Sequence, residues 1–317
     1  MRTITALFVG LGSIGTRHLK NLANLCADRG WTLQADALRS DLTRPLRPGA
    51  AELLHAQYTD PAAAPAHYDM VFITNPTSLH AEALRQVKGR GAALFIEKPI
   101  FSAEQTGLAL DELLPAGQKA YVAAPMRWCG AMLALKDRLP ALHPYCARVI
   151  CSSYLPDWRP GVDYRTVYSA RKALGGGVTI DLIHEWDYLV ELFGVPEKLY
   201  NFKGTYSELE IDSDDLSVYI AKYPTLLAEV HLDYFGRGYR RSIELFCRDG
   251  SYLADFGKGT LTLPDGTVQH YEEDVNRRYE REMEYFVDYA LTGCGESCNP
   301  PALALKVLKL TLGENVQ

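Results

Sequence analysis

Short apolar runs and helix-like segments alternate along the first 124 residues. Apolar runs rich in β-forming residues predict buried parallel strands, and apolar residues at helical spacing predict helices. In the first predicted helix His18 lies in the same stripe as the apolar residues. The predicted strands are residues 3–9, 31–38, 69–73, 92–96 and 119–124, and the predicted helical segments are residues 13–25, 49–57, 79–87 and 101–114. Strands that alternate with helices indicate an α/β domain built on a parallel sheet.

From about residue 146 the hydrophobic pattern changes. Apolar and polar residues alternate in runs at 147–154, 199–206, 216–222, 227–234, 241–247, 251–256 and 259–263. Such runs predict a mostly antiparallel sheet with one buried face. Two amphipathic helices are predicted at 276–291 and 302–312, with charges including Glu282 on a solvated face of the first. The pattern therefore predicts two domains, 1–123 and 124–317.

Composition excludes several classes of protein. The chain has 317 residues, of which 47% are hydrophobic and 23% charged, and a net charge of −6, so attraction to nucleic acid or anionic membranes is not expected. No apolar stretch approaches the ~20 residues that span a bilayer, and the first apolar segment reads as a strand, not a signal peptide. Seven scattered cysteines suggest reduced thiols and a cytoplasmic location. Cys294 and Cys298 alone cannot close a zinc site, so we expect no metal.

Three glycines follow the first strand at positions 10, 12 and 15. In this spacing Gly10 permits a tight turn, Gly12 lets the backbone approach a pyrophosphate, and Gly15 lets the helix pack close to the strand. The intervening Ser13 and Ile14 open the helix, whose N-terminal N–H groups attract phosphate. The segment predicts dinucleotide binding; the alternative is an ordinary glycine-rich turn.

The tip of the second strand carries Arg39 and Ser40. At this position an acidic residue typically binds the ribose of NAD, whereas a nearby arginine accommodates the 2′-phosphate of NADP. Asp36 and Asp41 are close in sequence, but Asp36 should alternate into the strand and Asp41 lies past the tip. The sequence favours NADP, with NAD as the alternative; Arg39 could also be a solvated strand-end charge.

Polar residues follow two further strands. Asn75 and Lys98 lie at the carboxyl ends of the strands at 69–73 and 92–96, where doubly wound sheets bind ligands. Both are expected to project toward the cofactor.

A third group of polar residues lies on the helix after the triple glycine at 175–177. His184 has Asp181 and Asp187 as neighbours three residues away, so one carboxylate can hold the imidazole while the other faces substrate or solvent. An imidazole suits proton transfer near neutral pH. On the residues alone, a histidine in such a helix is more often structural than catalytic.

Several of these motifs occur together in the order of a known family. The glycine loop, the Thr74-Asn75-Pro76 turn with His80, the Glu97-Lys98-Pro99 segment, and the triple glycine before Asp181 and His184 resemble the Gfo/Idh/MocA oxidoreductases. The resemblance implies a Rossmann domain followed by an α+β domain with a large open, mostly antiparallel sheet, which often forms dimers or tetramers. It also implies the site residues. The implied cofactor-binding residues are Asn75, Pro76, His80, Glu97 and Lys98, and the implied catalytic residues are Lys98, His184 and Asp181.

Two departures from the family pattern bear on the site. Two residues separate Asp181 from His184, where members such as inositol dehydrogenase have three, so we expect the Asp181 side chain to be rotated relative to the family geometry. Pro125 replaces the asparagine of the family's Asn-x-Arg pattern, while Arg127 is retained and is expected to contact cofactor or substrate.

The sequence thus predicts an NAD(P)-dependent oxidoreductase that moves a hydride to or from a carbon of a sugar, a cyclitol or a derivative. Lys98 would bind the reacting oxygen, His184 would serve as general acid or base, and Asp181 would orient substrate or His184. Arg159, Tyr164 and Arg165 are candidate substrate residues, and with Arg171 they suggest a carboxylate or phosphate on the substrate or, equally, a solvated basic loop. The alternatives are a non-catalytic regulator of the same fold and a reductase of an imine or unsaturated ring.

Overall fold

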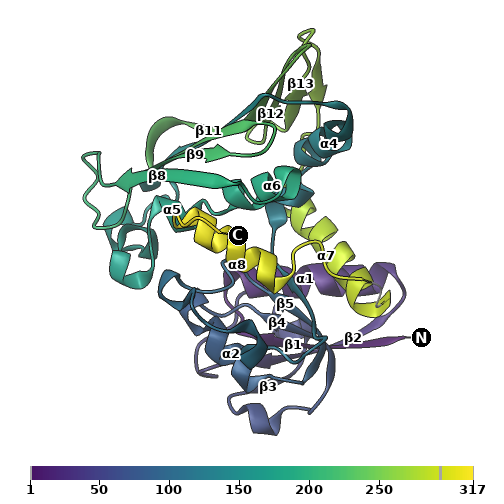
Figure 1. Ribbon diagram of the computed structural model, residues 1–317. Helices are drawn as coiled ribbons and strands as arrows, with labels where there is room; N and C mark the ends of the chain where they lie inside the picture. Colours follow the sequence, from purple (N-terminus) through teal and green to yellow (C-terminus); the bar gives the residue numbers. More distant parts are fainter. Residues whose placement is uncertain (1, 293–294, 317) are drawn as a thin grey trace. The chain divides into compact units, whose positions relative to one another are not determined.

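The computed structural model describes residues 2–292 and 295–316 (Figure 1). The chain divides into two compact units. The first comprises Met1–Ala123 and Tyr279–Leu305, and the second comprises Ala124–Arg278 and Lys306–Gln317. Residues 279–305, which the sequence places in the second domain, therefore group with the first.

The first unit is built on a six-stranded parallel sheet, which confirms the predicted α/β class. Its strand order is β3-β2-β1-β4-β5-β6, so the order reverses between β1 and β4, where open α/β sheets bind ligands. The strands are β1 (Thr3–Val9), β2 (Thr32–Leu38), β3 (Leu54–Tyr58), β4 (Tyr68–Ile73), β5 (Gly91–Ile96) and β6 (Lys119–Val122), and the helices between them are α1 (Ser13–Asp28), α2 (His80–Gln86) and α3 (Leu110–Leu113).

Stacked aromatic rings fill the core of the first unit. Phe8 and Phe72 lie face to face with ring centroids 4.5 Å apart. Helix α7 (Val275–Thr292) adds Phe286, whose ring lies edge-on to Phe72 and Phe95 at 5.4 and 5.2 Å. The predicted apolar face of this helix is thus buried, and its partner is the parallel sheet. This contact explains why residues 279–305 join the first unit.

One charge on α7 is not solvated as predicted. Glu282 is fully buried, and its carboxylate accepts a 2.8 Å hydrogen bond from the hydroxyl of Tyr121 on β6. A carboxylate can be buried in this way because a specific donor satisfies it.

Two predicted helical segments of the first unit are wrong. Residues 49–57 form a short 3-10 turn at Ala51–Leu53 followed by strand β3, because backbone pairing with β2 overrides the local helix propensity of this segment. Residues 101–114 form a 3-10 turn at Ala103–Gln105 and the short helix α3, with Gly107 between them, and glycine is a poor residue for a helix interior.

The second unit is built on an eight-stranded, mostly antiparallel sheet of order β14-β13-β12-β11-β7-β10-β9-β8, as predicted. β7 and β10 form its parallel pair. The alternating pattern located every strand except the short β14. The strands are β7 (Cys146–Tyr154), β8 (Lys198–Gly204), β9 (Leu216–Lys222), β10 (Leu227–Asp233), β11 (Phe235–Cys247), β12 (Gly250–Asp255), β13 (Thr260–Thr262) and β14 (Val268–His270).

Helices pack on one face of this sheet. Trp186 of α6 (His184–Phe193) lies edge-on to Tyr219 of β9, with ring centroids 5.2 Å apart, and both side chains are buried. The helix predicted after the triple glycine is interrupted, because α5 (Val178–Asp181) ends two residues before α6 begins. Asp181 and His184 therefore belong to two helices. The remaining helices are α4 (Gly130–Arg138) and α8 (Pro301–Thr311).

Candidate functional site

Hydrogen bonds tie together the loops that follow β1, β4 and β5. The Thr74 N–H donates to Val9 O at 2.9 Å, and the Thr74 hydroxyl donates to Gly10 O at 2.5 Å. The Glu97 N–H donates to Ile73 O at 2.9 Å. The structure therefore brings the glycine loop, Asn75 and Lys98 to one edge of the parallel sheet.

Each glycine of the loop meets a distinct steric demand. Gly10 has a φ of +83°, and a Cβ there would lie 2.7 Å from Asn75 Cα. A Cβ on Gly15 would lie 2.6 Å from the Thr74 hydroxyl oxygen, whereas one on Gly12 would meet nothing within 4 Å. The surroundings of Gly12 are thus open enough for a ligand to approach the backbone.

Helix α1 begins directly after this loop with its first turn uncapped. Gly12 is its N-cap, no side chain caps it, and its first turn holds no acidic residue. The first N–H groups of a helix have no partner within the helix, so those around Ser13 and Ile14 can bind an anion. The loop therefore fits the pyrophosphate of a dinucleotide.

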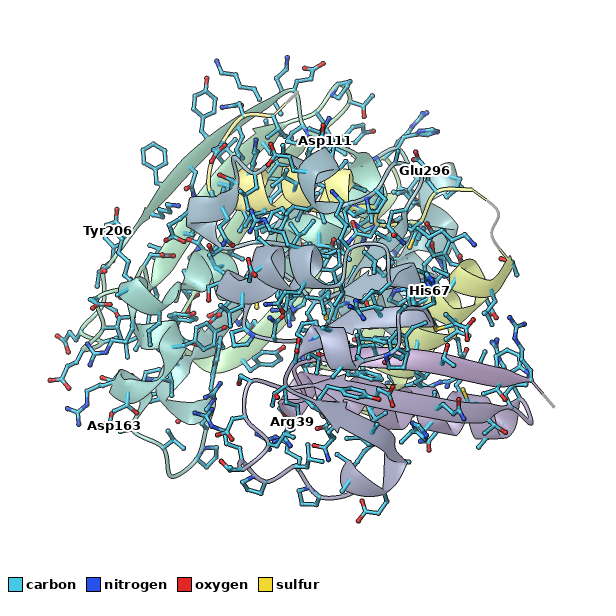
Figure 2. All side chains as sticks on the ribbon, turned by 90° about the horizontal axis from the view of Figure 1, so that it is seen from below. Arg39, His67, Asp111, Asp163, Tyr206 and Glu296 are labelled. Carbon is cyan, nitrogen blue, oxygen red and sulfur yellow. The ribbon has the colours of Figure 1, made fainter. Side chains whose placement is uncertain are left out.

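The tip of β2 presents Arg39 with its guanidinium held in place (Figure 2). Arg39 Nη1 donates to Gln57 Oε1 at 2.7 Å, and Nη2 donates to the backbone oxygen of Arg44. Ser40 beside it is exposed. This cation and hydroxyl lie one strand away from the glycine loop, since β2 pairs with β1.

The two nearby aspartates differ in availability. Asp36 is buried, accepts a 2.8 Å hydrogen bond from the Tyr68 hydroxyl, and lies 3.1 Å from His55 Nδ1. Asp41 is more exposed and accepts the Thr43 N–H, and the hydrogen bonds from Thr43 lower the pKa of its carboxyl. The Asp36 carboxylate is therefore occupied by partners within the protein, in agreement with its predicted position inside the strand.

His80 connects two loops from a buried position. Its Nε2 lies 3.0 Å from Asn75 O and its Nδ1 lies 3.2 Å from Ile100 O, and its side chain is 1% exposed. Burial lowers its pKa despite these hydrogen bonds. In this geometry His80 holds the turn at Asn75 and Pro76 in place. The contact between His80 and the cofactor that the family resemblance implies stays a prediction.

Lys98 is anchored through its neighbour Glu97. Glu97 Oε2 accepts the backbone N–H of Lys98 at 3.0 Å, and Glu97 Oε1 lies 2.6 Å from Nε2 of the buried His18. The Lys98 side chain itself is half-buried. In the sequence His18 is only one position of a helical stripe, and no local signal pairs it with a residue 79 positions away.

In the second unit, Asp181 is enclosed by two phenols. The Tyr168 hydroxyl donates to Asp181 Oδ1, and the Tyr234 hydroxyl donates to Oδ2 at 2.5 Å. Asp181 ends α5, and the partly exposed His184 begins α6. Neither tyrosine could be predicted as a partner from the sequence, because neither belongs to a motif that points to Asp181.

Arg127 is engaged in ion pairs. Its guanidinium donates to both carboxylate oxygens of Asp187 at 2.9 and 2.8 Å and to Glu191 at 2.6 Å, and its side chain is 3% exposed. Such bidentate pairs fix a guanidinium firmly. Arg127 therefore attaches the turn at Pro125–Trp128 to α6, and its expected contact with cofactor or substrate stays a prediction.

The candidate substrate arginines differ in their surroundings. Arg165 lies 2.9 Å from Asp163, which Figure 2 labels, and 2.7 Å from Glu210. Arg171 lies 3.9 Å from Asp212, and the Tyr164 hydroxyl accepts the N–H of Glu210. Arg159 is exposed and has no ion-pair partner among the residues that the structure describes.

Metal and membrane features are absent from the part of the chain that the structure describes. No group of three or more His, Cys, Asp or Glu side chains there could hold a metal ion. Cys294 lies outside the described residues, and the six described cysteines form no disulfide. No helix within 2–292 or 295–316 has the length and apolarity needed to cross a membrane.

Comparison with known proteins identifies the first unit. Residues 4–123 match the Gfo/Idh/MocA family model, described as an oxidoreductase family with an NAD-binding Rossmann fold. The N-terminal domain belongs to the Gfo/Idh/MocA oxidoreductase family. The resemblance inferred from the motifs is thereby confirmed, as is the prediction of an enzyme of the oxidoreductase class. A search of curated proteins finds no match to the chain.

Solved structures of other oxidoreductases share the fold of this chain over nearly its whole length. A myo-inositol 2-dehydrogenase from Lactobacillus plantarum is 19% identical, with a TM-score of 0.77 over 98% of this chain and 96% of that one. An Agrobacterium radiobacter oxidoreductase, in complex with NAD+, L-tartaric acid and magnesium, is 17% identical, with a TM-score of 0.79 over 98% and 95%. A levoglucosan dehydrogenase in complex with NADH is 16% identical, with a TM-score of 0.81 over 98% and 96%. At these identities the likeness shows the fold alone.

Proposed function

We propose that the protein is a cytoplasmic NAD(P)-dependent dehydrogenase that acts on a CH–OH group of a sugar, a cyclitol or a derivative of either. The observation that carries the proposal is the anchoring of Lys98, through Glu97, at the same sheet edge as an open glycine loop. That edge lies where open α/β sheets bind ligands. The scattered spacing of the seven cysteines, which forms no disulfide framework pattern, supports the location.

We propose NADP as the preferred cofactor, with NAD as the alternative. Arg39 offers a positioned cation at the tip of β2, with Ser40 next to it. Asp36, a rival partner for a ribose hydroxyl, is occupied by Tyr68. Partly exposed Asp41 is the feature that favours NAD, although its carboxylate lies 3.6 Å from the Arg44 guanidinium.

Residues of the chain would transfer the substrate's hydroxyl proton and stabilise the negative charge that develops on its oxygen. When bound, the nicotinamide ring accepts or supplies the hydride. The Lys98 ammonium would hydrogen-bond the substrate oxygen and stabilise alkoxide character as the C–H bond breaks. His184 would take the hydroxyl proton during oxidation and return it during reduction. Asp181 would orient the substrate or His184.

The substrate class is inferred from two lines of support. Relatives of this fold include a myo-inositol 2-dehydrogenase and a levoglucosan dehydrogenase, which points to a polyol. Exposed Arg159 supports a carboxylate or phosphate on that polyol, whereas Arg165 is matched by two carboxylates of its own unit. Uronates and sugar phosphates are therefore the first candidates.

A panel of sugars, inositols, uronates, sugar phosphates and nucleotide sugars tests this proposal. Each compound is incubated with the protein and NADP+ or NAD+, and reduced nicotinamide is followed by absorbance. We expect turnover with at least one polyol. Dinucleotide binding without turnover on the whole panel would favour a non-catalytic regulator, and turnover confined to imines or unsaturated rings would favour the other alternative.

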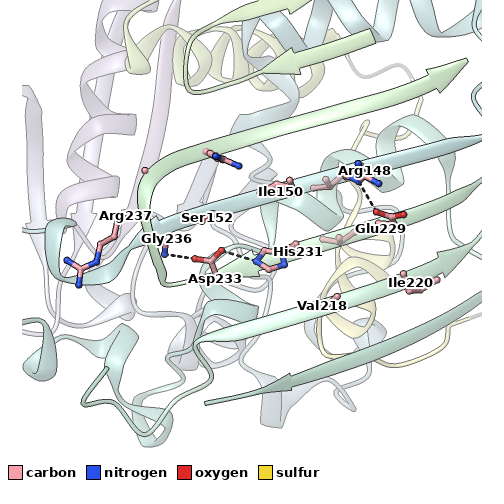
Figure 3. A pocket seen from close by; sticks show the side chains of 14 residues that line it. Arg148, Ile150, Ser152, Val218, Ile220, Glu229, His231, Asp233, Gly236 and Arg237 are labelled. Carbon is pink, nitrogen blue, oxygen red and sulfur yellow. Dashed lines mark hydrogen bonds and ion pairs between the residues drawn. The ribbon is translucent and has the colours of Figure 1, made fainter. Parts of the chain in front are cut away.

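We also propose that the outer face of the second sheet, opposite the face on which α6 packs, binds a second copy of the chain, giving a dimer or tetramer (Figure 3). A hollow of about 570 Å³ lies on this face and includes apolar side chains of Ile150, Val218 and Ile220. Polar pairs also line it, with Arg148 2.9 Å from Glu229 and His231 2.9 Å from Asp233. A face with both charges and apolar residues can complement a rotated copy of itself.

A further inference from the structure

The Asp181 carboxylate has both oxygens occupied by tyrosines that differ in exposure. Tyr234 is fully buried, with the Trp158 ring edge-on to it at 5.2 Å. Tyr168 is 42% exposed, and Asp181 itself is 7% exposed. Of the three side chains in this cluster, Tyr168 is the most exposed.

The triple glycine places Tyr168 beside Asp181. A Cβ on Gly176 would lie 2.0 Å from the backbone oxygen of Tyr168 and 2.7 Å from that of Ser169, so only glycine permits this approach. The Ser213 hydroxyl donates to Ser169 O at 2.7 Å and fixes the same turn. The motif therefore positions a tyrosine as well as opening a helix.

Tyr168 Oη hydrogen-bonds the Asp181 carboxylate and the side chain of Ser169, and a phenol oxygen can accept a further hydrogen bond. Its O–H donates to Asp181. Burial and the Asp181 charge raise the pKa of Tyr168, so the phenol stays protonated near neutral pH. A substrate hydroxyl is the complementary donor.

We propose that Tyr168 contacts the substrate by accepting a hydrogen bond from one of its hydroxyl groups, and that Asp181 is a positioning residue that acts through Tyr168. The proposal rests on the proposed polyol dehydrogenase function. It explains how Asp181 serves the site although its spacing from His184 is shortened and its oxygens are covered. It also assigns a role to the loop before the triple glycine.

Tyr168→Phe and Tyr234→Phe form a matched pair, because each removes one hydroxyl from the same carboxylate. With the best polyol from the panel, Tyr168→Phe should raise the substrate KM about 3- to 10-fold, the loss of one hydrogen bond, with the KM for NADP+ unchanged. Tyr234→Phe should lower the Tm and leave kcat/KM per folded molecule within about twofold. A Tyr168→Phe variant with wild-type KM would overturn the proposal, as would equal KM changes in both variants.

Asp181→Asn supplies the second test. If Asp181 acts through Tyr168, its variant should raise the same substrate KM, and the double variant should lose less than the product of the single losses. Strictly multiplicative losses would contradict the link between the two residues. No turnover by wild type on the panel would overturn the proposed function and this proposal with it, whereas turnover with an unaffected Tyr168→Phe overturns this proposal alone.

Discussion

His18 Nε2 lies 2.6 Å from Glu97 Oε1, and both side chains are buried in the first unit. The other Glu97 oxygen accepts the backbone N–H of Lys98, so helix α1 and the loop after β5 are joined through one carboxylate. The His18 ring also packs on Phe95, with centroids 4.7 Å apart. The helix that follows the glycine loop thereby also helps to hold the backbone of the proposed catalytic lysine.

Replacement of His18 should affect both stability and turnover. His18→Leu leaves a buried carboxylate without its donor, which should cost about 3 kcal/mol in the free energy of unfolding. It should also lower kcat, because Lys98 is less firmly held. His18→Gln keeps a donor and should recover part of both losses. Urea unfolding and kcat per folded molecule check this, and a His18→Leu variant with wild-type stability would contradict it.

Because of the Glu97 carboxyl, the free energy of unfolding should fall as the pH becomes acidic. Burial alone would raise its pKa, but the hydrogen bond and charge of His18 and the nearby Lys98 bring the pKa below its usual value. A lowered folded-state pKa stabilises the fold above the unfolded glutamate pKa of about 4.3, and this contribution is lost as the pH falls through the folded value. Urea unfolding at pH 6 and pH 3 should therefore show a smaller loss for Glu97→Gln than for wild type. Equal losses would contradict the assignment.

Arg39 should set the cofactor preference. Wild type should bind NADP(H) more tightly than NAD(H). Arg39→Asp should lower the ratio of the NAD(H) to the NADP(H) dissociation constant about 10-fold or more, which narrows or inverts the preference, because a charged hydrogen bond to the 2′-phosphate is lost. Arg44→Ala is the control, because it removes a neighbouring exposed cation and keeps the carbonyl that holds Arg39. Wild-type binding of NAD at least as tight as that of NADP in a titration would rule this out.

Assembly should depend on the outer face of the second sheet. Ile220 is 37% exposed and lines the hollow, so Ile220→Glu should place charges in the contact and dissociate the oligomer. Val268→Glu alters an exposed apolar residue of β14 outside the hollow and should leave the mass unchanged. Light scattering measures both. A wild-type monomer at micromolar concentration would refute the proposed assembly.

The sequence predicted the glycine loop and the strand-end residues well, because each depends on local spacing and on the rule that parallel strands end at one edge. It mispredicted residues 49–57, where tertiary pairing of β3 with β2 overrides helix propensity. The pattern of α7 showed that one face is buried, but no periodicity reveals that Phe286 packs on the parallel sheet.

The side-chain partners of the candidate site were the part that the sequence could not supply. Tyr234 lies 53 positions from Asp181, and His18 lies 79 positions from Glu97. Such pairs form only because the fold brings distant elements together, and neither a tyrosine nor a histidine at those positions breaks any local rule. The same holds for Arg127, whose ion pairs with α6 involve residues 60 and 64 positions away.

The kcat per folded molecule of Lys98→Ala and His184→Ala tests the central claim most directly. General acid–base catalysis contributes about 10²–10⁴-fold, so His184→Ala should lose activity in that range, Lys98→Ala should lose activity strongly, and both should keep near wild-type NADP affinity. The double variant should lose less than the product of the single losses if, as proposed, both residues act on one substrate oxygen. A structural His184 would instead lower the Tm and leave turnover of the folded fraction intact. Full activity per folded His184→Ala or Lys98→Ala molecule would contradict the account.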